Sequence, residues 1–500
     1  MLRSIGSNWL LTALTIGATY VLTPFVIHTM GDSGYGTWTL ITALTGYMSL
    51  LALGVPMACV RYLAQHVTEG DTARVNGVIG SCAGLYLMVG VASLVVGIGL
   101  TMALTTVYDI PASLQPQARL GCALMVLQVS LGFIGLLPEG IMFAHHDFVA
   151  RNVVRVAALA LRFGLTLGLL ALHASLVVLA AIQLATLVFD FTATLVLIRR
   201  RYPGVRVHLG DFDWGVVRRI FSFSLYVLLL GAGARLSFET DALVIGAVLG
   251  VAAIPFYAVA NSLIVYLLEF TIAIAAVVSP MATRLETAGR RDELVALFLK
   301  WSKISLSLAL MAGAFLVVLG PRFIGWWIGG GYEEGSGAVL RILTISCFAF
   351  LPVRGVALPI LMGLGKPRTP TIAFLGAGVL NLVLSVVLAR PLGLAGVALG
   401  TAIPNVLFAA VVLVVACREL RIGMGAYLRY VVPRACAGAL PPLALLIWCK
   451  TGMQVQSFPG MVAAGAAMLA VFAITWPLFV YRGDPYVDLR PRRLLDWSRA

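Results

Sequence analysis

The chain has 500 residues, of which 60% are hydrophobic and only 11% are charged, and its formal net charge is +14. Charged residues make up about 25% of an ordinary soluble protein. The composition therefore excludes a soluble multidomain enzyme, a disordered protein and a disulfide scaffold, and it predicts a chain that is embedded in lipid.

Long apolar runs recur along the whole chain. A helix needs about 20 apolar residues to cross a bilayer, so a chain of this length has room for about 14 spans. The runs lie at 8–30, 37–60, 76–105, 119–143, 153–172, 175–198, 219–247, 253–283, 296–329, 337–362, 371–388, 395–417, 430–449 and 459–481. None alternates with the period of a membrane β-barrel. We predict an all-α polytopic membrane protein with about 14 transmembrane helices.

The basic residues gather in every second connector between these runs. The richer connectors hold, among others, Arg61, Arg74, Arg199, Arg200, Arg201, Arg218, Arg284, Arg290, Arg291, Lys366, Arg368, Arg418, Arg482 and Arg490. The alternate connectors hold only Arg119, Arg322, Arg390 and Lys450. By the positive-inside rule, both termini are cytoplasmic. The positive net charge thus records topology and contact with anionic lipids, and the chain has no basic domain for nucleic acid.

The chain contains an internal repeat. The segment "PMACVRYLAQHVTEGDTARV" at 56–75 matches "PMATRLETAGRRDELV" at 280–295, and each follows the inner end of a span. An offset of six spans gives both copies the same orientation, so we expect two parallel six-helix lobes. The predicted divisions are an N-terminal lobe at 1–198, a cytoplasmic linker at 199–218, a C-terminal lobe at 219–417, two additional helices at 418–481 and a basic cytoplasmic tail at 482–500.

Several segments resemble one family of membrane transporters. They include "GDSGYGTWTLITALTGYMSLLALGVPMACVRYLAQ" and "GLGKPRTPTIAFLGAGVLNLVLSVVLARPLGLAGVALGTAI". These are similar to bacterial polysaccharide repeat-unit flippases (the O-antigen and exopolysaccharide type) of the multidrug/oligosaccharidyl-lipid/polysaccharide exporter superfamily. The resemblance covers about 1–417 and implies a V-shaped bundle around a central cavity. It also implies movement of an undecaprenyl-diphosphate-linked oligosaccharide from the inner to the outer leaflet of the bacterial inner membrane.

Two other functions stay open at this point. A cation-coupled multidrug exporter has the same fold, but such exporters often carry an acidic residue in the first span, and 8–30 has no charge. The lipid II flippase characteristically carries an Arg-Asp pair there, which this chain lacks. A membrane-embedded glycosyltransferase or polymerase is the second alternative. Those proteins typically carry catalytic groups on long outer loops, and the outer loops here are short.

Charges inside the spans are the candidate functional residues, because an ion at the bilayer centre costs about 2.5–3.5 kcal/mol on insertion scales. Arg354 lies in "LPVRGVALP", and a span interrupted by proline and glycine points toward a substrate site. Glu139 lies at the matching place in "LPEG", as a cavity or proton-coupling candidate. Guanidinium forks suit a diphosphate, so Arg354 and Arg235 are its expected ligands. Arg235 pairing with Glu239 and Arg354 pairing internally are the alternatives.

The remaining intramembrane charges have other expected roles. Glu269, in the middle of the eighth span, is the main candidate for ion coupling. Arg162 and Asp190 lie on adjacent spans at similar depth, so we expect a structural ion pair. Asp241 is expected at the outer interface.

We expect no metal, no cofactor and no catalysis. The chain has no zinc signature, phosphate-binding glycine loop or nucleophile elbow. The resemblance implies three kinds of partner, namely a lipid-linked oligosaccharide, membrane lipids, and the polysaccharide polymerase and glycosyltransferases.

Overall fold

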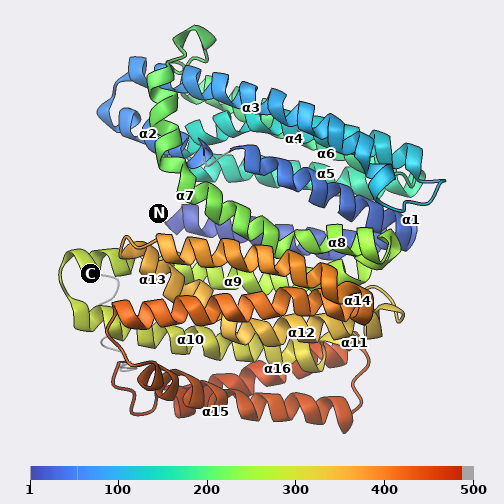
Figure 1. Cartoon of the computed structure of the whole chain (residues 1–500), viewed down its shortest axis with the longest axis vertical. Helices are drawn as coiled ribbons and strands as arrows, with labels where there is room; N and C mark the ends of the chain where they lie inside the picture. Colours follow the sequence, from blue (N-terminus) through green and yellow to red (C-terminus); the bar gives the residue numbers. More distant parts are fainter. Residues whose placement is uncertain (1, 53–54, 487–500) are drawn as a thin grey trace. The chain divides into compact units, whose positions relative to one another are not determined.

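The computed structural model describes residues 2–52 and 55–486, and it describes only the backbone of residues 2–5, 209, 219–228 and 270–273. It is 88% helical, and the described residues contain no strand. Helices α3 and α4 run side by side in the first half of the chain, and α12 and α14 do so in the second half (Figure 1). The all-α prediction is confirmed. The predicted basic tail lies outside the described residues from 487 onward.

The chain divides into two compact units. Unit 1 comprises Met1–Arg235 with Ala242–Pro255, and unit 2 comprises Leu236–Asp241 with Phe256–Ala500. The sequence analysis assigns the seventh span to the C-terminal lobe, whereas most of that span groups with unit 1. The two additional helices group with unit 2.

Unit 1 is built from long apolar helices around a core between α2, α3 and α4. Its helices are α1 (Leu2–Tyr47), α2 (Val55–Glu69), α3 (Thr72–Val107), α4 (Gln115–Ala144), α5 (Phe148–Leu172), α6 (Leu176–Arg201), α7 (Trp214–Phe238) and most of α8 (Thr240–Val248). The hydroxyls of Ser93 and Ser130 share a buried hydrogen bond of 3.0 Å between α3 and α4. Helix α1 bends at Gly31, whose φ of 68° suits glycine, and so contains two spans.

Unit 2 contains the other long helices. They are α9 (Ile254–Thr287), α10 (Arg291–Val318), α11 (Gly320–Trp327), α12 (Tyr332–Pro352), α13 (Leu358–Gly363), α14 (Arg368–Glu419), α15 (Met424–Thr451) and α16 (Phe458–Thr475). Helix α14 turns at Gly393, where φ is 59°. Its two arms pack against each other. Asn381 on the first arm donates a hydrogen bond of 2.8 Å to Thr401 on the second, and Ser385 on the first lies against Gly400 on the second.

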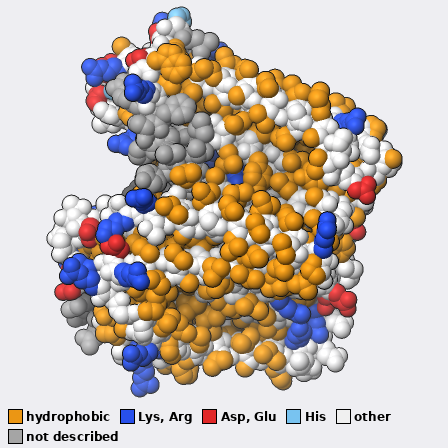
Figure 2. Space-filling model, viewed as in Figure 1, with side chains coloured by type: hydrophobic (Ala, Val, Ile, Leu, Met, Phe, Trp, Pro, Cys, Tyr) orange, Lys and Arg blue, Asp and Glu red, His pale blue; other side chains and the backbone are white. Residues whose placement is uncertain are grey.

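The number of spans agrees with the sequence. Within the described residues, 11 helices are long and apolar enough to cross a membrane. Two of these, Gly6–Ala52 and Arg368–Glu419, hold two arms each. With α7 and α8 as a further span, the total reaches the predicted value of about 14. Hydrophobic side chains cover the middle of the helices, and charged side chains gather near their ends (Figure 2).

One predicted span is shorter than expected. The apolar run at 296–329 was assigned to a single helix, but α10 ends at Val318 and α11 begins at Gly320. Pro321 stands at the start of α11, where its missing N–H and fixed φ suit a new helix rather than the interior of an old one. Helix α11 is therefore a separate short helix.

Candidate functional site

Arg354 lies on an irregular turn in the middle of a span. Helix α12 ends at Pro352, Val353–Ala357 form a turn of π-helix, and α13 follows from Leu358. Pro359 lies at the start of α13 and lacks the N–H that would bond to the preceding turn. Single π turns inside α-helices occur frequently at functional sites. The interruption that the sequence predicts around Arg354 is thus present in the structure.

The surroundings of Arg354 are aromatic rather than acidic. Its guanidinium carbon lies 5.2 Å from the ring centroid of Phe374, within the range of a cation–π interaction. Phe374 is fully buried and contacts the rings of Phe238 and Phe408. No acidic side chain among the described residues forms an ion pair with Arg354. A half-buried cation without a counter-ion is a suitable ligand for an anion.

Arg235 and Glu269 are the two remaining candidate residues that the sequence assigns to the second lobe. Arg235 is half-buried, and its backbone carbonyl accepts a hydrogen bond of 3.1 Å from the hydroxyl of Tyr47. Helix α7 ends three residues later, and Glu239 separates it from α8. Glu269 is exposed on α9, and the side chains of residues 270–273, which follow it, lie outside the described residues. The substrate role of Arg235 and the coupling role of Glu269 stay predictions.

Asp190 has a different partner from the one expected. Arg151, which is only 4% exposed, donates to both oxygens of the Asp190 carboxylate, at 2.6 Å and 2.9 Å. Arg151 also contacts Glu139 at 3.4 Å, and Arg155 pairs with the other oxygen of Glu139. The predicted Arg162–Asp190 pair is therefore replaced by a four-residue network at one end of α4, α5 and α6. Both oxygens of Glu139 have guanidinium partners, which is typical of a structural carboxylate.

We expect Arg151→Leu to destabilise unit 1 strongly, because it leaves Asp190 without its bidentate partner in a largely buried network. Breaking such a pair from one side costs about 3–5 kcal/mol. Arg155→Leu is the matched control, since the Arg155 side chain is 37% exposed and Glu139 keeps Arg151. Its effect should be about 1 kcal/mol or less. The midpoint of thermal unfolding of the purified protein measures both, and equal shifts would contradict this assignment.

Arg162 lies apart from the network, near the middle of α5. Its side chain is exposed and lines a cavity in unit 1 together with residues of α1 and α6. The described residues offer it no carboxylate within ion-pair distance. The structure thus separates Arg162 from Asp190 and places its side chain in the lining of a cavity with both polar and apolar groups.

Asp241 belongs to a buried polar network that the sequence analysis missed. Asp241 is only 3% exposed and so is buried among protein side chains, while its position at the outer membrane interface stays a prediction. Tyr257 donates a hydrogen bond of 2.6 Å to its carboxylate, and Thr401 donates at 3.0 Å. Asn381 donates in turn to Thr401 at 2.8 Å. Polar residues in four apolar segments were the signal in the sequence, but nothing in the spacing links them.

The Asp241 network contains a buried hydrogen-bond acceptor that remains available to a ligand. The carbonyl oxygen of the Asn381 side chain is buried and has no hydrogen-bond partner among the described residues. Among the described residues, no Lys, Arg or His forms an ion pair with Asp241. A carboxylate with hydroxyl and amide oxygens nearby has the chemistry to hold a proton or a small hard cation. It lacks the several carboxylates typical of a divalent-metal site.

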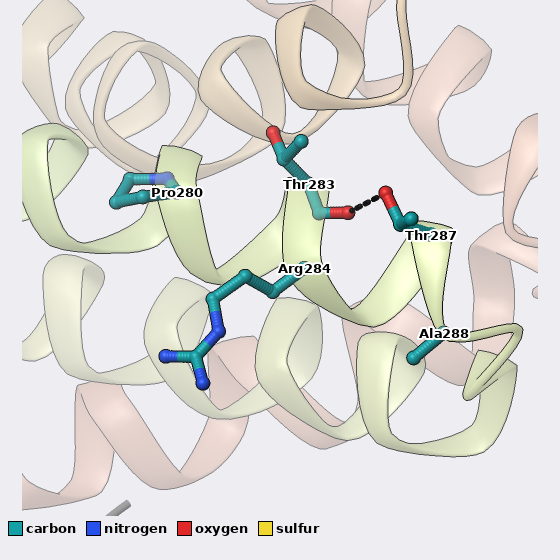
Figure 3. Close-up of a pocket in the computed structure, with 5 residues that line it drawn as sticks. All are labelled: Pro280, Thr283, Arg284, Thr287 and Ala288. Atoms are coloured by element: carbon teal, nitrogen blue, oxygen red, sulfur yellow. Dashed lines mark hydrogen bonds between the residues drawn. The ribbon is translucent and has the colours of Figure 1, made fainter.

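A larger hollow lies at the end of α9. It has a volume of about 640 Å³ and is lined by Pro280, Thr283, Arg284, Thr287 and Ala288. Four of them lie on α9 and Ala288 directly follows its last residue, and the hydroxyl of Thr287 donates a hydrogen bond to the backbone carbonyl of Thr283 (Figure 3). Arg284, the cation in this lining, is one of the basic residues whose distribution predicts the orientation of the chain in the membrane. The hollow is a surface depression rather than an enclosed binding site.

Comparisons with known proteins place this geometry in context. A family model described as "Polysaccharide biosynthesis protein" matches residues 1–286. A similar protein of Bacillus subtilis (strain 168), named "Uncharacterized membrane protein EpsK", is 22% identical over 488 residues, which are 94% of this chain and 94% of that protein.

Two solved structures share the fold. "Lipid II flippase MurJ, inward closed conformation" has a TM-score of 0.72 at 11% identity, over 94% of this chain and 98% of that one. An inward-facing multidrug resistance transporter of the MATE family has a TM-score of 0.69 at 16% identity, over 81% and 94%. At these identities the likeness concerns the fold alone.

Proposed function

The chain belongs to the polysaccharide biosynthesis protein family, and we therefore propose that it is a flippase for undecaprenyl-diphosphate-linked oligosaccharide repeat units. The family and its structural neighbours are flippases and transporters of the multidrug/oligosaccharidyl-lipid/polysaccharide exporter superfamily. The proposed direction is from the inner to the outer leaflet of the bacterial inner membrane, with both termini in the cytoplasm. The alternation of basic connectors supports this orientation.

The observation that carries the substrate class is Arg354. A half-buried guanidinium on a π turn, with an aromatic ring on one face and no acidic partner among the described residues, is prepared for an anionic ligand. The diphosphate is the anion that every lipid-linked repeat unit of this kind carries. Charge-assisted hydrogen bonds to phosphate are roughly twice as strong as neutral ones. Arg235 is the second proposed ligand.

Transport should be coupled to an ion through Asp241. The carboxylate is buried with neutral donors, so binding of a proton or a monovalent cation changes its net charge from negative to zero. Such a change shifts a conformational equilibrium only if the two conformations bind the ion with different affinities. Two ions fit this chemistry equally, namely a proton and sodium. Glu269 is the alternative coupling residue.

Reconstitution tests the proposed function directly. Purified protein is placed in vesicles that contain a lipid-linked oligosaccharide with an undecaprenyl diphosphate anchor, and a membrane-impermeant glycosidase reports the glycan on the outer face. We expect trimming to proceed well beyond the outer-leaflet fraction only when the protein is present. Vesicles loaded with a cationic dye form the second arm. Dye export together with an absence of glycan flipping would support a drug exporter and reject the flippase.

We expect Asp241→Asn to remove most of the dependence of transport on an ion gradient. The amide retains the size of the carboxylate but has no charge to neutralise, so the stimulation by a sodium or proton gradient should fall by about tenfold, equivalent to about 1.4 kcal/mol. Asp109→Asn, at an exposed position after α3, is the control. Initial rates with and without each gradient give the ratio. Full stimulation of the Asp241→Asn variant would exclude this carboxylate and direct attention to Glu269.

A further inference from the structure

The cavity beside Arg162 is a space inside unit 1 with a mixed polar and apolar lining that the proposed diphosphate ligands do not use. It has a volume of about 170 Å³ and lies between α1, α5 and α6. A water molecule occupies about 30 Å³ of the liquid, so the cavity has room for about six waters, comparable to one sugar ring. Its lining includes hydroxyls, an amide, an indole and one guanidinium, and the polar groups come from all three helices.

Among the described residues that line the cavity, Arg162 is the only charged one. It lies near the middle of α5, a helix of 25 residues that is apolar enough to cross the membrane. An uncompensated guanidinium at that depth costs about 2.5–3.5 kcal/mol on insertion scales. Since no described carboxylate pairs with it, water or an anionic ligand must solvate it. The planar fork fits a carboxylate in a bidentate arrangement.

The hydroxyl groups around the cavity act mainly as acceptors. Thr23 and Thr166 donate their protons to backbone carbonyls of their own helices, at 2.8 Å and 2.7 Å, and Thr15 does the same at 2.8 Å. Their lone pairs remain available to a ligand that donates hydrogen bonds. Sugar hydroxyls are such donors, whereas lipid tails are not. The side chain of Gln183 adds both a donor and an acceptor on α6.

A polar stripe on α1 continues from this cavity. Asn8, Thr12, Thr15, Thr19 and Thr23 recur three or four residues apart and so share one face of the first arm of α1. At the far end of the stripe, Asn152 on α5 donates a hydrogen bond to Asn8. A row of polar side chains is not expected on a helix arm that contacts only lipid tails. Trp38, from the second arm, supplies an aromatic surface of the kind that packs on sugar rings.

We propose that this cavity binds one acidic sugar residue of the glycan, with Arg162 paired to its carboxylate and the threonine and glutamine side chains bonded to its hydroxyls. The proposal rests on the flippase function and adds a substrate class to it, namely repeat units that contain a uronic acid. The size of the cavity limits recognition to a single ring. The site is distinct from Arg354, which lies in unit 2.

Isothermal titration of the full-length protein in nanodiscs tests this site with free probes at millimolar concentration. Glucuronate should bind about tenfold or more tightly than glucose, which lacks the charge, and than acetate, which lacks the ring. Arg162→Gln should remove this preference, and Arg162→Lys should retain part of it. Thr19→Val, at an exposed position on α1, should weaken glucuronate without unfolding the protein.

The control is Arg119→Gln, because Arg119 is exposed near the start of α4 and, among the described residues, its side chain bonds to Thr105. It should leave glucuronate binding unchanged. Acetate or glucose binding as tightly as glucuronate would overturn the acidic-sugar assignment, as would an Arg162→Gln variant with unchanged affinity and unfolding midpoint. The titration involves no transport, so it can fail while the vesicle assay still supports the flippase.

Discussion

Arg354→Ala should reduce glycan export by about 10- to 150-fold at matched protein levels, since hydrogen bonds to a charged group contribute about 1.5–3 kcal/mol. The loss arises because the alanine variant has no guanidinium to offer the diphosphate. Arg354→Lys should retain part of the rate, because lysine keeps the charge but lacks the planar fork. Export in a strain that lacks the chromosomal gene, or flipping in vesicles, measures the effect.

Stability distinguishes this functional role from a structural one. Arg354 has no acidic partner among the described residues, so removing it abolishes no ion pair and relieves a half-buried charge. The thermal unfolding midpoint of Arg354→Ala should therefore equal or exceed that of the parent protein. Arg390→Ala, at an exposed position near the turn of α14, is the control and should export normally. Full export by Arg354→Ala would remove this residue from the proposed mechanism.

Lys303→Met should lower the free energy of unfolding of unit 2 by up to about 3–5 kcal/mol, because it removes the nearer of the two cations beside a buried carboxylate and leaves Arg434, 3.7 Å away, as the partner. Lys303 on α10 pairs with Asp484, which follows the last span, and both side chains are 0% exposed. Lys303 also donates to the backbone carbonyl of Val480 at 2.9 Å, and Tyr430 on α15 donates to Asp484 at 2.9 Å. These contacts attach the two additional helices to α10.

A second, more exposed ion pair in unit 2 provides the control. Lys366 and Glu419 form a pair whose side chains are 52% and 32% exposed, so Lys366→Met should cost about 1 kcal/mol or less. The double variant Lys303→Met with Asp484→Asn should recover much of the lost stability, because the buried carboxylate is removed together with its nearer cation and the remaining partner, Arg434, is 42% exposed. Unfolding midpoints of the purified variants give the comparison. If Lys303→Met and Lys366→Met shift the midpoint equally, the buried pair has no special role in stability.

The spans were predictable because the free energy of inserting a segment into the bilayer depends mainly on the residues of that segment. Apolar length and the distribution of Lys and Arg are local properties, and together they predicted an all-helical protein with about as many spans as the described helices provide. Breaks within the spans were partly predictable. Proline and glycine mark the π turn at Arg354, but the separation of α11 from α10 at Pro321 was missed inside a continuous apolar run.

Pairing of charges was harder to predict than their positions. Arg151, Arg155 and Arg162 lie four and seven residues apart on one face of α5, so each was a possible partner for Asp190. Counting residues from the turn between α5 and α6 favoured Arg162, and that count assumes straight, parallel helices. The structure selects Arg151, because helix rotation and the position of Glu139 on α4 bring their side chains together.

The chain's apolar content first indicated a membrane protein. The free energy of moving a segment into lipid depends on the residues of that segment alone, so this prediction does not require the positions of neighbouring helices. The burial of Asp241 and the open cavity at Arg162 are of a different kind. They depend on how α1, α5 and α6 pack in one unit, and on how Tyr257, Asn381 and Thr401 meet in the other. Helix rotation results from many weak packing contacts between residues that are distant in the chain, and no local pattern encodes that sum.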